Sequence, residues 1–142
     1  MAFENPSREE IKEILLNAGN IAVVGLSDKT DRTSYMVAQA LQNNGYRIIP
    51  VNPTVSGEIL GEKVYPSLSD IPEPVDIVNV FRRSEQTPPV AEEAVKIGAR
   101  VLWLQLGIVS DEAYEIASKG GQTVIMDRCI KVEDSILIGK RS

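Results

Sequence analysis

Hydrophobic and polar positions follow two alternating patterns along the chain, one typical of helices and one typical of buried strands. Predominantly apolar runs, as in strands that are buried on both faces, occupy residues 21–25, 46–51, 75–81, 101–104 and 122–126. Between them, apolar residues recur at helical spacing over about 8–18, 33–44, 87–97 and 111–119. This alternation predicts an α/β protein with a mainly parallel, doubly wound sheet.

Local signals set the ends of these segments. Ser7 and Glu10 form a capping box before the first helix, and Gly19 is predicted to be its C-cap. Residues 54–74 are rich in Gly and Pro and are predicted to be turns, with a short strand near Val64. The tail, 130–142, is predicted to be a loop with an extended piece at 136–138. The whole chain, 1–142, is expected to form one domain, with segment 1–19 packed on it as a helix.

Composition and charge exclude several classes of function. No apolar run approaches the roughly 20 residues that cross a bilayer, and the N-terminus lacks the basic and apolar regions of a secretory signal. A net charge of −5 argues against a nucleic-acid partner. The single cysteine, Cys129, fits a reducing compartment, so we expect a cytoplasmic protein.

Four predicted strands end in residues suited to ligand binding. Their exits read Gly25-Leu26-Ser27, Asn52-Pro53, Phe81-Arg82-Arg83 and Gln105-Leu106-Gly107. The carboxyl ends of parallel strands share one edge of a sheet, and ligands bind there at the point where the strand order reverses. We expect this point to lie between the first strand and the strand that ends at Phe81.

The chemistry of these exits favours an anionic, nucleotide-like ligand. Gly25 lets the backbone turn tightly against a ligand, so a bulky side chain there should impair binding more than stability. The helix that begins near Thr33 offers free N–H groups to a pyrophosphate, and Lys29 and Arg32 add positive charge. The planar guanidinium of Arg82 also suits phosphate.

The sequence lacks the motifs of two common nucleotide-binding classes. Loop 25–34 reads GLSDKTDRTS, without the G-x-G-x-x-G of dinucleotide folds, and the second strand ends in Asn52 instead of an acidic residue. The G-x-x-x-x-G-K-[ST] pattern of nucleoside triphosphatases is also missing. Ordinary NAD binding and triphosphate hydrolysis are therefore disfavoured.

A set of short motifs in a fixed order carries a family resemblance. The motifs are Gly25-x-Ser27 with Arg32-x-Ser34, Gly45-Tyr46, Pro50-Val51-Asn52-Pro53, Tyr65-Pro66-Ser67-Leu68, Val75-Asp76, Val80-Phe81-Arg82, Gly98-Ala99, Trp103-Leu104-Gln105-x-Gly107 and Asp127-Arg128-Cys129. Over nearly its whole length the chain resembles the small stand-alone CoA-binding proteins, which are similar to the nucleotide-binding domain of the succinyl-CoA synthetase α subunit. The resemblance implies a Rossmann-like domain that binds coenzyme A without an established reaction.

The strand exits and the resemblance together predict the ligand site. It comprises Gly25, Leu26, Ser27, Lys29, Arg32, Thr33, Ser34, Asn52, Pro53, Phe81, Arg82, Arg83, Gln105 and Gly107. Two of these have an alternative interpretation, since Phe81 could simply close the core and Arg83 could face solvent. Asp127 and Arg128 are interpreted as an ion pair or a surface turn.

One departure from the family bears on catalysis. The family often carries Glu-His after the cysteine motif, whereas here Glu133 is followed by Asp134, and the chain contains no histidine. It cannot form the phosphohistidine of the synthetases, and neither Cys129 nor Ser27 has an evident base. The residues therefore favour a CoA-binding protein over an enzyme. A sensor of NAD(P) or another nucleotide, and an acyl-CoA thioester or acyl-transfer enzyme, are the alternatives. The sequence leaves open the oligomeric state, including a homo-oligomer, any protein partner and the reactivity of Cys129.

Overall fold

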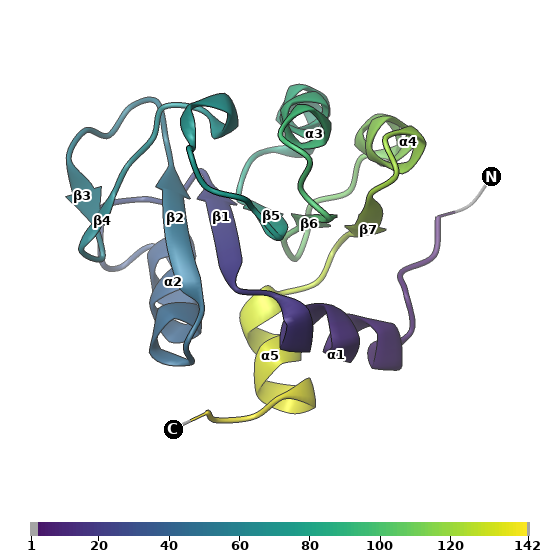
Figure 1. The fold of residues 1–142 in the computed structure, drawn as a ribbon, viewed down its shortest axis with the longest axis horizontal. Coiled ribbons are helices and arrows are strands. Elements are labelled where there is room, and N and C mark those ends of the chain that lie inside the picture. The colour runs from purple at the N-terminus through teal and green to yellow at the C-terminus, as the bar shows by residue number, and fades with distance from the viewer. Residues whose placement is uncertain (1–2, 142) are drawn as a thin grey trace.

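A five-stranded parallel sheet forms the centre of the molecule, seen in the computed structural model, which describes residues 3–141. Its strands are β1 (Asn20–Val24), β2 (Arg47–Val51), β5 (Ile77–Val80), β6 (Val101–Leu104) and β7 (Thr123–Ile125). They lie in the order β2-β1-β5-β6-β7, and Ile21 of β1 is opposite Ile48 of β2 and Ile77 of β5 (Figure 1). The order reverses between β1 and β5, which confirms the doubly wound, Rossmann-like prediction.

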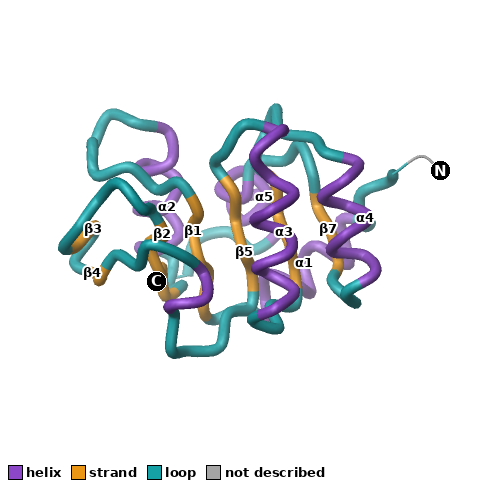
Figure 2. Tube along the Cα trace, turned by 90° about the horizontal axis from the view of Figure 1, so that it is seen from above, coloured by secondary structure: helices purple, strands orange, loops and turns teal. Residues whose placement is uncertain are grey.

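Helices cover both faces of this sheet. The α1 (Arg8–Asn17), α2 (Thr33–Asn43) and α5 (Ile130–Leu137) helices lie on one face, and α3 (Thr87–Lys96) and α4 (Asp111–Lys119) on the other (Figures 1 and 2). Along β1, Ile21 and Val23 pack toward the first group, whereas Ala22 and Val24 pack toward the second. Because alternate side chains are buried on both faces, the strands read as nearly continuous apolar runs.

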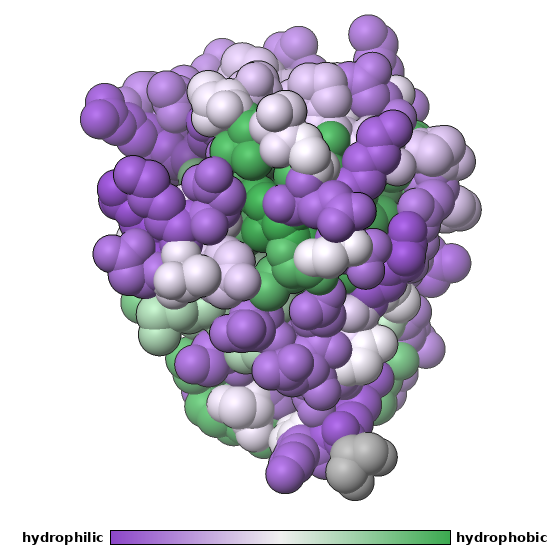
Figure 3. All heavy atoms as spheres, turned by 90° about the vertical axis from the view of Figure 1, so that its left-hand side faces the viewer, coloured by the Kyte–Doolittle hydropathy of each residue, from purple (hydrophilic) through white to green (hydrophobic). Residues whose placement is uncertain are grey.

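The segment between β2 and β5 crosses the sheet without a long helix. It contains β3 (Glu58–Ile59), β4 (Glu62–Lys63) and the short 3-10 helix η1 (Leu68–Asp70); a second 3-10 helix, η2 (Ser84–Gln86), follows β5. The predicted short strand near Val64 is β4. Figure 3 shows this side of the molecule, where polar residues surround a central group of hydrophobic ones. Val55 and Leu60 belong to the partly buried residues that pack on the core here.

The prediction for the tail was wrong, since residues 130–137 form α5 instead of a loop with an extended piece. Two charged residues, Glu133 and Asp134, lie on the buried face of this helix and obscure its amphipathic pattern. Asp134 accepts hydrogen bonds from the Tyr46 hydroxyl (2.6 Å) and Asn44 Nδ2 (2.7 Å). Burial, together with Asp134, raises the pKa of Tyr46 well above its usual range. Polar partners far away in sequence thus satisfy the buried Asp134 carboxylate.

The end of α1 also differs from the prediction. The capping box is present, because Ser7 Oγ accepts from the Glu10 N–H, but the C-cap is Ala18 in an extended conformation. Gly19 has no positive φ; instead, its N–H donates to Asp76 Oδ2 at 2.8 Å. The glycine therefore leads the chain into β1 and does not cap the helix.

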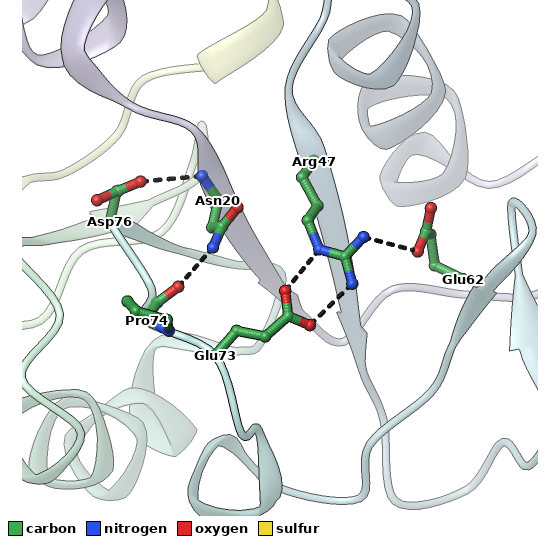
Figure 4. Close-up of polar contacts among 6 residues, drawn as sticks. All are labelled: Asn20, Arg47, Glu62, Glu73, Pro74 and Asp76. Atoms are coloured by element: carbon green, nitrogen blue, oxygen red, sulfur yellow. Dashed lines mark hydrogen bonds and ion pairs between the residues drawn. The ribbon is translucent and has the colours of Figure 1, made fainter.

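Polar contacts join the amino ends of the strands, at the edge opposite the predicted site (Figure 4). Arg47 Nε and Nη2 donate to the two carboxylate oxygens of Glu73 at 2.6 and 2.8 Å, and its Nη1 lies 3.5 Å from Glu62. The Arg47 guanidinium lowers the pKa of Glu73. This bidentate pair joins β2 to the segment that leads into β5.

We expect Glu73→Gln to lower the free energy of unfolding at neutral pH by less than about 1 kcal/mol, because the Arg47 side chain is 48% exposed and solvent screens the pair. The folded-state pKa of Glu73 is lowered, so its contribution is complete above the unfolded-state pKa and disappears as the pH falls through the folded-state value. Urea unfolding of both proteins at several pH values measures this. A difference that persists in acid would contradict the ionic origin.

Candidate functional site

Two adjoining cavities form a groove at the carboxyl edge of the sheet, across the switch point between β1 and β5. The first, of about 470 Å³, lies against loop 25–34 and the end of β2, and the second, of about 420 Å³, lies against the ends of β5 and β6. Thr33 and Phe81 line both cavities. The groove is therefore continuous from the exit of β2 to the exit of β6, along the edge where ligands bind in such sheets.

Loop 25–34 is held in place by its own polar side chains. Ser34 Oγ accepts from the Ser27 N–H at 3.1 Å, and Ser27 Oγ accepts from the Lys29 N–H at 3.0 Å. Asn52, at the end of β2, donates from Nδ2 to the Leu26 carbonyl at 3.0 Å. Ser34 and Asn52 thus shape the wall of the first cavity through the backbone that they hold.

Only glycine fits at the end of β1, because the neighbouring exit of β5 leaves no room for a side chain there. Gly25 has a φ of +88°, and a Cβ built on it would lie 2.4 Å from the carbonyl oxygen of Phe81 and 3.4 Å from Arg82 Nε. The expectation that added bulk at Gly25 would act mainly on a ligand therefore needs correction, because the nearest atom is backbone. The close approach of β1 to the exit of β5 also brings Arg82, which lines the second cavity, near Gly25, which lines the first.

The start of α2 faces the first cavity with its N–H groups available. Arg32 is the N-cap residue, but its side chain makes no capping hydrogen bond. The first N–H groups of a helix have no partner within the helix and form an electropositive end. Thr33 and Ser34, the first two helical residues, line the first cavity. An anion in this cavity would therefore meet directed backbone donors.

Four cationic side chains line the groove, Lys29 and Arg32 in the first cavity and Arg82 and Arg83 in the second. Within residues 3–141, none of the four forms an ion pair. Among the described residues, Asp28 is the only acidic one that lines either cavity. In a chain of net charge −5, the groove therefore concentrates an excess of positive side chains.

The second cavity combines apolar walls with one buried amide. Phe81, Leu106 and Ile108 supply apolar surface, Cys129 lies at the N-cap of α5, and the buried Gln105 is only 4% exposed. Phe81 packs on the core and also lines the groove, so its role toward a ligand stays a prediction. Cys129 is half-buried and lies in the groove wall. The groove therefore changes from polar to apolar along its length.

Three of the predicted residues line neither cavity. Leu26 is fully buried, Pro53 is exposed, and the N–H of Gly107 donates to Asp127 Oδ1 at 2.7 Å. Asp127 adopts a φ of +57° at a bend, and Arg128 Nη1 donates to its carbonyl, with no ion pair between the two side chains in the described chain. The predicted site also lacked six groove residues, namely Asp28, Thr54, Val55, Leu106, Ile108 and Cys129. Leu106 carried a usable signal, because it is an apolar residue two positions after the end of a buried strand.

Comparisons with known proteins agree on one domain family. A family model described as a CoA binding domain matches residues 19–135. The uncharacterized protein YneT of Bacillus subtilis is 58% identical over 134 residues, which cover 94% of this chain and 98% of YneT. A hypothetical protein from Pyrococcus horikoshii OT3 has a solved structure that superposes with a TM-score of 0.91 and 36% identity, over 98% of this chain and all of that one.

A larger relative contains a similar segment. The alpha subunit of the ADP-forming acetate–CoA ligase I of Pyrococcus furiosus is 33% identical over 115 residues. The match covers 76% of this chain but only 24% of that subunit. The similarity thus concerns one part of the ligase subunit.

Proposed function

This chain belongs to the CoA-binding domain family, and we propose that it binds coenzyme A or an acyl-CoA in the groove at the carboxyl edge of its sheet. The observation that carries the proposal is a set of four cations around a groove at the switch point, Lys29, Arg32, Arg82 and Arg83, which form no ion pair in residues 3–141. Coenzyme A combines a phosphorylated nucleotide with a long, largely uncharged arm. Both parts have a matching surface in this groove.

In this proposal the first cavity takes the phosphates. Gly25 and Ser27 line it with backbone, α2 presents the N–H groups of Thr33 and Ser34, and Lys29 and Arg32 add charge-assisted contacts. Arg82 lines the second cavity near Gly25 and is in reach of a diphosphate. Asn52 positions the loop through the Leu26 carbonyl, and Pro53 follows it after the end of β2. Gly107 is held by Asp127 at the exit of β6. The second cavity, with Phe81 and Gln105, takes the uncharged arm, and Arg83 lies at its rim.

We assign no reaction to the groove. Within residues 3–141, neither Ser27 nor Cys129 has a hydrogen bond to a titratable side chain that could act as its base. The ligase subunit is four times longer than the matching segment, and this chain has no histidine to carry a phosphoryl group. Binding alone is the function that these residues support best. No helix among the described residues is long and apolar enough to cross a membrane.

A thermal-shift screen tests the proposal. At a concentration of about 100 times Kd, a ligand that binds only the folded state stabilises it by ~2.7 kcal/mol, which should raise Tm by about 5–10 °C in a chain of this size. We expect this shift with coenzyme A, a smaller one with 3′-dephospho-CoA, and none with NAD, NADP or ATP. A larger shift with NAD or NADP would favour the nucleotide sensor instead. Absence of any shift with coenzyme A would reject the proposal.

We expect Cys129→Ser to leave the affinity for coenzyme A within about twofold, because the phosphates and adenine should supply most of the specific binding. Isothermal titration calorimetry of the reduced proteins measures this. A tenfold loss would show that the thiol contributes directly to the site. Intact-mass spectrometry after incubation with CoA disulfide separately reports whether Cys129 forms a mixed disulfide.

A further inference from the structure

Gln105 is a buried glutamine at the exit of β6. Its side-chain oxygen accepts hydrogen bonds, whereas its side-chain nitrogen donates none within residues 3–141. Gln105 Oε1 accepts from the Ile130 backbone N–H at 3.3 Å and from Asn79 Nδ2 at 3.3 Å. Ile130 begins α5, directly after Cys129, and Asn79 lies in the middle of β5. The β5 strand and the start of α5 thus both bind the side-chain oxygen of Gln105.

Backbone groups determine the orientation of both amides. The Ile130 N–H can only donate, so the atom of Gln105 that faces it must be the oxygen. Asn79 Nδ2 also lies 3.4 Å from the Trp103 carbonyl, which can only accept, so Asn79 cannot be reversed either. This arrangement leaves Asn79 Oδ1 buried without a partner. An unsatisfied buried oxygen is costly, so the orientation of Gln105 is maintained at the expense of stability.

The remaining half of the Gln105 amide opens into the apolar cavity. Within residues 3–141, Gln105 Nε2 donates no hydrogen bond. Unlike Asn79 Oδ1, it is not sealed from solvent, and Gln105 lines the cavity with Phe81, Leu106 and Ile108. A rigidly oriented neutral donor therefore lies beside the apolar walls of a cavity whose charged groups are Arg82 and Arg83. Such a donor selects ligands that place an acceptor opposite it, because any other ligand leaves the donor desolvated and unpaired.

We propose that Gln105 Nε2 recognises a carbonyl oxygen in the uncharged arm of the ligand, and that this contact selects a coenzyme A-type arm over a bare nucleotide. The inference rests on the proposed function and names a specificity-determining residue within that site. The acceptor is an amide carbonyl of the pantetheine arm or the thioester carbonyl of an acyl-CoA. Both present the same neutral sp² oxygen, which suits a neutral amide donor beside apolar walls.

The test compares ligands with and without the arm by calorimetry. The probes are coenzyme A, acetyl-CoA and adenosine 3′-phosphate 5′-diphosphate, which has the nucleotide end alone. We expect Gln105→Met to weaken coenzyme A and acetyl-CoA binding by about tenfold or more, and nucleotide binding by less than about twofold. A loss confined to acetyl-CoA would assign the contact to the thioester carbonyl, and an equal loss for both would assign it to the arm.

Two further variants control for structure. Gln122→Met makes the same change at a buried glutamine whose Nε2 donates to the Ala99 carbonyl, at the opposite edge of the sheet, and should leave all three affinities unchanged. Gln105→Glu keeps an oxygen for Ile130 and Asn79 and, when ionised, removes the donor. If Gln105→Met does not fold, arm-containing ligands should lose more affinity to Gln105→Glu than the nucleotide, whose loss measures the repulsion from the added charge.

The outcomes separate the inference from the proposed function. Arm-containing ligands that bind Gln105→Met and Gln105→Glu as tightly as wild type would overturn the inference alone. A loss that is equal for the nucleotide and for coenzyme A would also overturn it, because the contact would not involve the arm. Wild-type protein that binds none of the probes would overturn both.

Discussion

Gly25→Ala should lower the free energy of unfolding by about 3 kcal/mol. A non-glycine residue in the left-handed region costs roughly 1–2 kcal/mol, and overpacking adds a further ~1–3 kcal/mol. Here the new Cβ would lie 2.4 Å from the Phe81 carbonyl oxygen, which is backbone of the neighbouring strand exit and cannot rotate away. Relief of this contact requires β1 and β5 to separate at the floor of the groove. Urea unfolding measures the loss.

Gly121→Ala is the matched control for this prediction. Gly121 has a nearly equal φ, +84°, but a Cβ there would meet no atom of the described chain within 4 Å. It should therefore show only the conformational cost of about 1–2 kcal/mol. If the two variants lose the same stability, the contact with Phe81 is not the cause. We also expect Gly25→Ala to bind coenzyme A poorly, since the strand exits that form the groove must shift.

The second large effect concerns the charge at the start of α2. Arg32→Ala should weaken coenzyme A binding by about 1.5–3 kcal/mol, or roughly 10- to 150-fold, because one charge-assisted contact to phosphate is lost. The Arg32 side chain is exposed, forms no ion pair in residues 3–141 and does not cap its helix. Its removal should therefore leave Tm nearly unchanged. Calorimetry and thermal unfolding of the same preparation separate the two effects.

Arg100→Ala removes the same charge from the opposite edge of the sheet and is the control. Arg100 is exposed and immediately precedes β6, far from the strand exits. Its loss should alter coenzyme A affinity by less than about twofold, since exposed charges beyond a Debye length are screened. Equal weakening by both substitutions would mean that only the overall charge matters. Unchanged affinity in Arg32→Ala would remove Arg32 from the site.

The sequence predicted the sheet well, because strands that are buried on both faces appear as continuous apolar runs. Ile21, Ala22 and Val23 face alternate sides of the sheet, and all are apolar because both sides are covered by helices. The positions of these apolar runs also predicted the switch point and the four strand exits, where the two cavities lie. Prediction succeeded where the apolar character of a whole segment follows from its burial between two layers of helices.

Prediction failed where a residue depends on one distant partner. Nothing near Asp134 shows that Tyr46 and Asn44, about 90 positions earlier, will satisfy its carboxylate, so the helix that carries it was missed. Gly25 was correctly placed at a turn, but its reason is the Phe81 carbonyl, which becomes a neighbour only when β1 pairs with β5. The type of a residue indicates which interactions its side chain can make. The tertiary fold determines which partner it contacts.

The walls of the groove come from segments that are far apart in sequence, at residues 25–34, 52–55, 81–83, 105–108 and 129. These segments are distributed over the first, middle and last thirds of the chain. A molecule bound along the whole groove would act as a non-covalent cross-link between the exit of β2 and the start of α5. Occupancy would then couple the unfolding of β2, an edge strand of the sheet, to that of α5, a helix that follows the last strand. The ligand would make the chain a more cooperative folding unit than its sequence alone does.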